Sequence, residues 1–73
     1  MVTLELIKKN ITEAIRQSGK TQSQIAKELN VTQSCIAHYN SGDSAPFLDT
    51  FANLCIVLDV DANDILGIKS INM

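Results

Sequence analysis

The chain has 73 residues, of which 45% are hydrophobic and 19% are charged, and its formal net charge is -2. This length has room for one domain with a small core, so we expect residues 1–73 to form a single globular domain, and the composition excludes a disordered tail. The sequence shows neither an apolar run long enough for a membrane span nor the pattern of a signal peptide, which favours a cytoplasmic protein.

The first predicted helix spans about residues 3–18. Apolar residues recur there at intervals of three and four, the spacing that places side chains on one face of a helix. The residues at this spacing are Leu4, Ile7, Ile11, Ala14 and Ile15. Gly19 follows, and glycine commonly ends a helix because it adopts the left-handed conformation without strain.

The second predicted helix begins at Thr21. Gln24 lies three residues later, and this capping-box spacing lets the two side chains bind each other's free backbone N–H groups. The residues expected to face the core are Ile25, Ala26 and Leu29. Asn30 is expected to end the helix, because asparagine tolerates the left-handed backbone of a sharp turn, and Val31 then fills the turn.

Thr32 is expected to cap a third helix that runs from Gln33 to about Tyr39. The inward residues of this helix are Ile36 and Tyr39. The outward residues are Gln33, Ser34, Ala37 and His38. The outward face is therefore polar and carries no fixed charge.

A loop rich in small and polar residues follows at 41–46. Two helices are predicted after it, within about residues 47–66. Apolar residues at helical spacing mark the fourth helix, namely Leu48, Phe51, Ala52, Cys55 and Leu58. Asp61, with Asp64 three residues later, can start a short fifth helix that Gly67 ends. No segment alternates at period two, so the sequence predicts an all-α fold.

The segment 21–39 is predicted to form a helix, a three-residue turn and a second helix. This unit places its second helix in the major groove of DNA. Ala26 supplies the small residue that two steeply crossing helices need. The net charge opposes nucleic-acid binding mildly, but residues 1–40 carry five basic and three acidic side chains, net +2, whereas residues 41–73 carry one lysine and five aspartates, net -4.

The segments TQSQIAKELNVTQSCIAHYNSG and PFLDTFANLCIVLDVDANDIL resemble the Cro/repressor (XRE-like, lambda-repressor-like) family. The resemblance covers roughly residues 4–68. It implies a compact five-helix domain in which the second and third helices form a helix-turn-helix. It also implies double-stranded DNA as the partner, bound by a symmetric homodimer on a short palindromic operator.

The resemblance assigns two kinds of DNA contact to this chain. The positions that read bases in the family correspond to Gln33, Ser34 and His38. The positions that contact phosphates correspond to Gln22, Thr32 and Ser41, and Lys20 and Lys27 are added to them by position and charge. Gln33 can form a bidentate pair with adenine, and the N-terminus of the helix that begins at Gln22 favours an anion.

The chain departs from the family pattern at three places. Asn30 and Asp59 replace common glycines, and both tolerate left-handed geometry. A buried Arg–Glu pair of the family is replaced by Ile15 and Asn40, which leaves no lone buried charge. Residues 43–45 replace basic loop residues by an aspartate, a serine and an alanine. This last change predicts weak operator binding by a single subunit.

Several assignments leave an alternative open. The polar residues of the third helix could form a solvated face, His38 could be merely exposed, and the two lysines could serve solubility alone. Apolar residues that the core cannot hold suggest a homodimer patch, although a C-terminal tail that covers its own domain is an equal alternative. The residues of this patch are Phe47, Ile56, Ile68 and Ile71.

We expect a sequence-specific DNA-binding transcriptional regulator that acts as a repressor. The alternative is a helical protein-interaction module, or an antitoxin-like partner, with weakened DNA binding. An enzyme is disfavoured, because no nucleophile, base and orienting group can be assembled from His38, the two cysteines and the scattered aspartates. Cys35 and Cys55 are isolated, so we expect reduced thiols, and no metal site, cofactor or small-molecule substrate is predicted.

Overall fold

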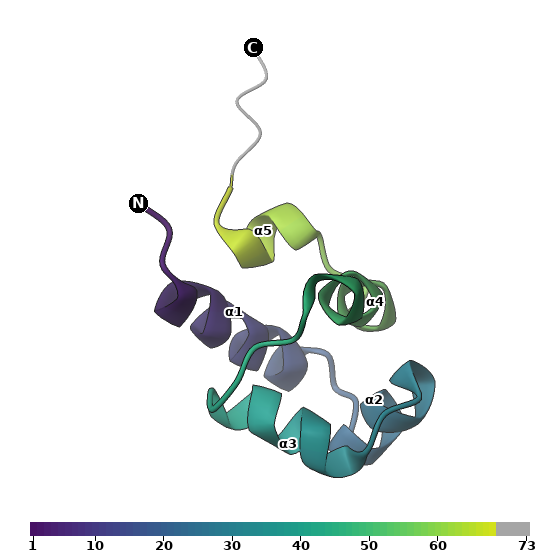
Figure 1. The fold of residues 1–73 in the computed structure, drawn as a ribbon. Coiled ribbons are helices and arrows are strands. Elements are labelled where there is room, and N and C mark those ends of the chain that lie inside the picture. The colour runs from purple at the N-terminus through teal and green to yellow at the C-terminus, as the bar shows by residue number, and fades with distance from the viewer. Residues whose placement is uncertain (69–73) are drawn as a thin grey trace.

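The fold consists of five short helices joined by tight turns (Figure 1). The computed structural model describes residues 1–68. Its helices are α1 (Leu4–Gln17), α2 (Gln22–Leu29), α3 (Gln33–Ser41), α4 (Leu48–Leu58) and α5 (Ala62–Leu66). The regular structure of residues 1–68 is entirely helical, which confirms the predicted all-α architecture. None of these helices has the length and apolar character that a membrane crossing requires.

Helix starts are set by side chains that accept hydrogen bonds from free backbone N–H groups. The hydroxyls of Thr3, Thr21 and Thr32 accept from the N–H groups of Leu6, Gln24 and Cys35, at 3.2, 3.0 and 3.2 Å. The carboxylate of Asp61 caps α5 in the same way, by accepting from the Asn63 N–H. These caps confirm the predicted helix starts. α4 differs, because it begins after Phe47 without a side-chain cap.

Helix ends are set by residues with a left-handed backbone. Asn30 closes α2 with φ 60° and ψ 45°, and Asp59 closes α4 with φ 57° and ψ 49°. After Asn30 the Val31 N–H donates to the Ala26 carbonyl at 2.9 Å, so the chain reverses within three residues. Both residues therefore do what the common glycines of the family would do.

The core lies between the five helices, and each of them contributes buried residues to it. Ile25, Ile36 and Leu54 are its most deeply buried large side chains, with 0%, 0% and 2% of their surface exposed. α3 packs against α1 and α2, α4 packs against α2, and α5 packs against α1. Burying a side chain of this size contributes about 1.5–3 kcal/mol, so this cluster holds α2 and α3 in a fixed relation.

Three details of the predicted helices are wrong. Leu4 lies on the periodic face of α1 but is 56% exposed, because the first turn of the helix projects beyond the core. Leu48 and Ala52 of α4 are exposed, and Leu54, which the pattern left out, is buried. α3 continues to Ser41, two residues beyond its expected end, because the residue with the left-handed backbone that ends the helix is Gly42.

Candidate nucleic-acid interface

α2 and α3 are joined by residues 30–32 and pack closely on each other. Ala26, expected at their crossing, is 4% exposed. The capping box at the start of α2 is complete: the Gln24 N–H donates to the Thr21 hydroxyl at 3.0 Å, and the Thr21 N–H donates to the Gln24 amide oxygen at 3.3 Å. The predicted helix-turn-helix is therefore present, with a rigid turn.

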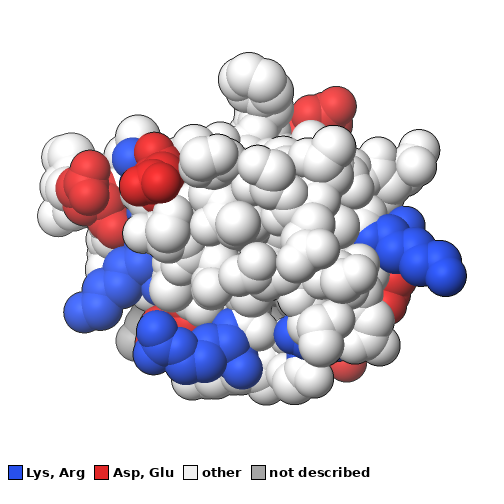
Figure 2. All heavy atoms as spheres, turned by 90° about the horizontal axis from the view of Figure 1, so that it is seen from below, with Lys and Arg blue, Asp and Glu red and all other residues white. Residues whose placement is uncertain are grey.

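The outer face of α3 is exposed and lies at the end of the molecule opposite the N-terminus (Figure 1). Gln33, Ser34 and His38 are exposed there, while Ile36 and Tyr39 are buried against the core. Figure 2 views the molecule from this side, and the centre of the surface carries no Lys, Arg, Asp or Glu side chain. Basic and acidic side chains both lie at its edges. The exposed polar side chains of α3 are thus uncharged, and charges of both signs lie around them.

The predicted phosphate contacts lie at helix ends. Gln22 is half-buried at the first position of α2, and Thr32 and Ser41 are exposed at the two ends of α3. Thr32 uses its hydroxyl oxygen as the cap of α3, and the Ser41 hydroxyl donates to the His38 carbonyl at 3.1 Å. Thr32 and Ser41 therefore lie at the two ends of α3, and Gln22 lies at the start of α2.

The two lysines differ in their surroundings. Lys20 Nζ lies 2.8 Å from Glu28 Oε1 and donates to the Val57 carbonyl at 3.0 Å, so it ties α2 to the last turn of α4. Lys27 is exposed and forms no ion pair within the described residues. A phosphate contact by Lys20 would require it to leave two partners, whereas Lys27 is free to reach one.

The junction between α1 and α3 is apolar and contains one bridging hydroxyl. Ile15 is 4% exposed, and Asn40 is half-buried. The Thr12 hydroxyl lies 3.2 Å from the Lys8 carbonyl and 3.3 Å from the Tyr39 carbonyl, so it links the two helices. The position of the family's buried ion pair is therefore filled by packing and a neutral hydrogen bond.

A contact that the sequence analysis did not predict lies at the end of α3. His38 Nδ1 is 3.5 Å from Asp43 Oδ2, and both side chains are more than half exposed. The contact depends on the turn at Gly42, where φ is 82°. The spacing of five residues offered no signal of its own, because it becomes a contact only when the helix ends in a left-handed turn.

Two ionisable side chains inside the fold have raised pKa values. Burial, followed by contact with the Cys35 side chain, raises the pKa of Tyr39 to about 12. Burial, followed by the charge of Asp61, raises the pKa of the Cys55 thiol. Both cysteines are free thiols, as the sequence analysis expected. Both shifts favour the neutral form, which suits a core role for these side chains.

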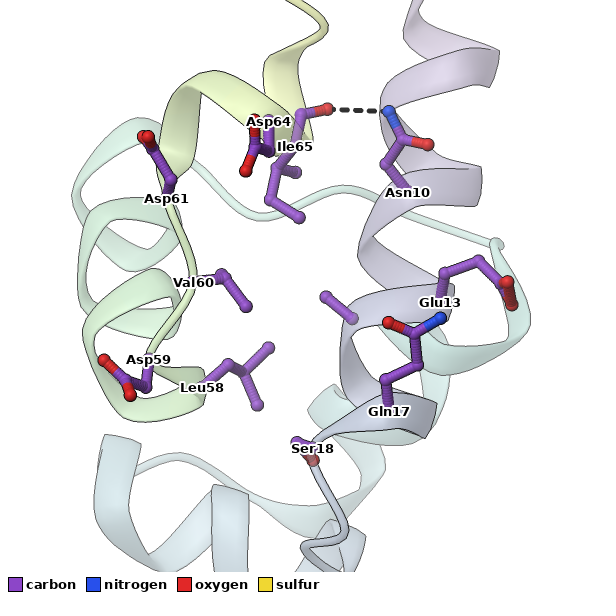
Figure 3. A pocket seen from close by; sticks show the side chains of 11 residues that line it. Asn10, Glu13, Gln17, Ser18, Leu58, Asp59, Val60, Asp61, Asp64 and Ile65 are labelled. Atoms are coloured by element: carbon purple, nitrogen blue, oxygen red, sulfur yellow. Dashed lines mark hydrogen bonds between the residues drawn. The ribbon is translucent and has the colours of Figure 1, made fainter.

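A polar cleft of about 520 Å³ lies between α1 and the α4–α5 turn (Figure 3). Its lining includes four carboxylates, those of Glu13, Asp59, Asp61 and Asp64. The Asn10 amide crosses it and donates to the Ile65 carbonyl at 3.0 Å. Within residues 1–68 no three metal-ligating side chains come together. The cleft involves neither α2 nor α3 and is separate from the helix-turn-helix surface.

The helix-turn-helix family model HTH_3 matches residues 11–65. No curated protein matches the chain in sequence. Among solved structures, the SOS-response transcriptional repressor LexA from Eubacterium rectale is similar with a TM-score of 0.76 and 23% identity, over 96% of this chain and 74% of that one. A transcriptional regulator from Listeria innocua is similar with a TM-score of 0.70 and 22% identity, over 92% of this chain and 63% of that one.

Proposed function

The chain belongs to the HTH_3 helix-turn-helix family and is a DNA-binding transcriptional regulator, and we propose that it acts as a repressor on a short palindromic operator. The observation that carries this proposal is the exposed, polar and uncharged outer face of α3, held on a rigid core. Repression follows if the protein occupies DNA that the polymerase needs. The family is non-enzymatic, in agreement with the expectation from the sequence.

In the proposed complex α3 lies in the major groove and Gln33, Ser34 and His38 read base edges. Gln33 stands at the first position of α3, beside the Thr32 cap, where a side chain reaches the groove floor most directly. A glutamine amide matches the N6 and N7 groups of adenine. Residues at the helix ends contact phosphates and hold α3 in register. These are Gln22, Thr32, Ser41 and Lys27, with Lys20 if it leaves its internal partners.

We propose a homodimer as the binding unit, since an isologous pair matches a palindromic site. Three of the predicted patch residues are exposed apolar side chains: Phe47 by 84%, Ile56 by 75% and Ile68 by 54%. The fourth, Ile71, lies outside the described residues. Ile56 lies on α4, outside the helix-turn-helix formed by α2 and α3, so pairing through it does not use the side chains of the reading face. Sedimentation velocity should show a dimer that Ile56→Asp dissociates, and a wild-type monomer at high micromolar concentration would refute this part.

The operator proposal is tested by selection from a randomised duplex pool, followed by fluorescence anisotropy on the enriched site at several salt concentrations. We expect a palindrome, with log affinity falling by about 0.9 per phosphate contact for each tenfold rise in salt. Gln33→Ala should relax one base position and cost about 1–3 kcal/mol. Gln17→Ala is the matched control, because Gln17 is an exposed glutamine on the cleft side of α1 (Figure 3).

The alternative is a protein-interaction module, or an antitoxin-like partner, with weakened DNA binding. It is favoured by Phe47 and Leu48, which are each 84% exposed and follow the loop that contains Asp43. Apolar side chains exposed to this degree are typical of protein contacts. If no duplex is enriched and binding remains weak at low salt, this alternative replaces the operator proposal.

A further inference from the structure

A backbone hydrogen bond brings His38 and Asp43 close together at the end of α3. α3 ends at Gly42, and the Asp43 N–H then donates to the His38 carbonyl at 3.0 Å. This bond fixes the backbone of Asp43 one turn below His38. The two side chains consequently lie on the same side of the helix end, with Asp43 Oδ2 3.5 Å from His38 Nδ1. The juxtaposition is therefore a consequence of the helix cap.

We propose that Asp43 is a positioning residue for base reading, which keeps the proton of the neutral His38 ring on Nδ1 so that Nε2 is presented to DNA as an acceptor. This inference rests on the proposed function, since it concerns the same α3 surface. A carboxylate accepts hydrogen bonds and cannot donate them, so Asp43 Oδ2 at 3.5 Å favours the tautomer with its hydrogen on the nearer nitrogen, Nδ1. Nε2 has no hydrogen-bond partner within the described residues and is left for the ligand.

The position of this proton decides which base edge His38 selects. In the major groove, adenine N6 and cytosine N4 are donors, whereas guanine N7 and O6 are acceptors. An Nε2 acceptor therefore selects an amino group of adenine or cytosine and opposes guanine.

The charged groups on the helices next to α3 do not contact the His38 ring, so Asp43 is the acidic residue that can affect it. Two helices pack against α3. On α2, Glu28 pairs with Lys20. Lys27, also on α2, forms no ion pair within residues 1–68, and on α1 Glu13 pairs with Arg16. The other ionisable side chains of α1 are Glu5, Lys8 and Lys9. Within the described residues, Asp43 supplies the only carboxylate within 4.0 Å of the His38 ring.

The first test observes the proton directly and needs no DNA. The chain contains one histidine, so its ring nitrogens are assigned without ambiguity in a long-range proton–nitrogen NMR spectrum. At about pH 8 we expect the Nδ1–H tautomer in the wild type and the Nε2–H tautomer, which free imidazole side chains prefer, in Asp43→Ala. An Nε2–H tautomer in both proteins would overturn the proposal. Asp43→Glu should restore part of the Nδ1–H population.

The second test measures the preference itself, with a randomised duplex pool and the wild type, His38→Ala and Asp43→Ala. The base position that His38→Ala relaxes identifies the His38 contact. Asp43→Ala should reduce the adenine or cytosine preference there by about threefold to tenfold, the value of one hydrogen bond, and leave the Gln33 position unchanged.

The outcomes separate this inference from the proposed function. If Asp43→Ala changes affinity equally for every sequence, Asp43 acts only by repelling phosphates, and the inference is wrong while the operator proposal stands. If the wild type enriches no duplex, the operator proposal fails and the DNA-reading part of the inference falls with it. The NMR result then still decides whether Asp43 sets the His38 tautomer.

Discussion

Lys20 offers the sharpest test of how the helix-turn-helix is held in place. Its ammonium group contacts Glu28 at 2.8 Å and the Val57 carbonyl at 3.0 Å, and its side chain is 31% exposed. The ion pair is partly solvated and contributes up to about 1 kcal/mol. A cation on a carbonyl in the last turn of α4 adds about 0.3–1 kcal/mol through the helix dipole. Together these contributions reach at most about 2 kcal/mol, and we expect about 1 kcal/mol.

We therefore expect Lys20→Gln to lower the free energy of unfolding by about 1 kcal/mol. For a domain of this size that corresponds to a Tm lower by about 4–8 °C, because each kcal/mol shifts Tm by about 4–8 °C. Thermal unfolding followed by circular dichroism at 222 nm measures the change. Lys27→Gln is the matched control, since it removes the same charge from α2 at an exposed position without an ion pair in the described structure.

The reasoning fails if the two variants have the same Tm within about 1 °C, since Lys20 would then contribute no more than its charge. DNA binding separates the two roles of this lysine. If Lys20 contacts a phosphate in the complex, Lys20→Gln reduces the salt dependence by about 0.9 per decade, as we expect for Lys27→Gln. A lower Tm with an unchanged salt dependence would show that Lys20 only holds α2 to α4.

Three further predictions concern the turn and the core. Asn30→Ala should lower the free energy of unfolding by about 1 kcal/mol, because alanine is strained in the left-handed conformation. Asn30→Gly should leave this free energy unchanged or raise it, and urea titration of both variants measures the difference. Burial raises the pKa of Tyr39 to about 12, against about 10 in an unfolded chain, so folding favours the neutral side chain. The free energy of unfolding should therefore be unaffected below about pH 10 and should fall by up to about 2–3 kcal/mol as the pH rises toward 12. Tyr39→Phe should lack this fall, and an identical pH profile for both proteins would contradict the assignment. In the Cys35→Ser variant Cys55 is the remaining thiol, and burial raises its pKa. It should therefore react with Ellman's reagent at least about tenfold more slowly in the folded protein than in guanidinium chloride. Equal rates would show that this thiol is accessible.

Much of the fold follows from local interactions that can be predicted from the spacing of residues in the sequence. The caps at Thr3, Thr21 and Thr32 and the turns at Asn30 and Asp59 involve residues within about five positions of each other. Such contacts form whenever the helix forms, so spacing alone predicts them. The helix-turn-helix was predictable for this reason, and the assignment of its exposed side chains to DNA contacts stays a prediction.

The face of α4 was not predictable in this way. Its eleven residues are apolar on several sides, so no polar stripe identifies the face toward solvent. Helical spacing therefore placed Leu48 and Ala52 with the buried residues and left out Leu54. Only the position of α4 against α2 decides which side is covered, because burial depends on what the neighbouring helices can reach.

The sequence by itself thus determined where most helices of the described chain begin and end, with the end of α3 as an exception, and which helix exposes an uncharged polar face. The tertiary structure decided which charged groups remain available on that surface. Lys20 meets the Val57 carbonyl across 37 residues, and Asp43 meets His38 only because Gly42 reverses the chain. The physical reason is range: a cap is satisfied within one turn of helix, whereas the partner of a long or exposed side chain depends on the packing of the whole chain.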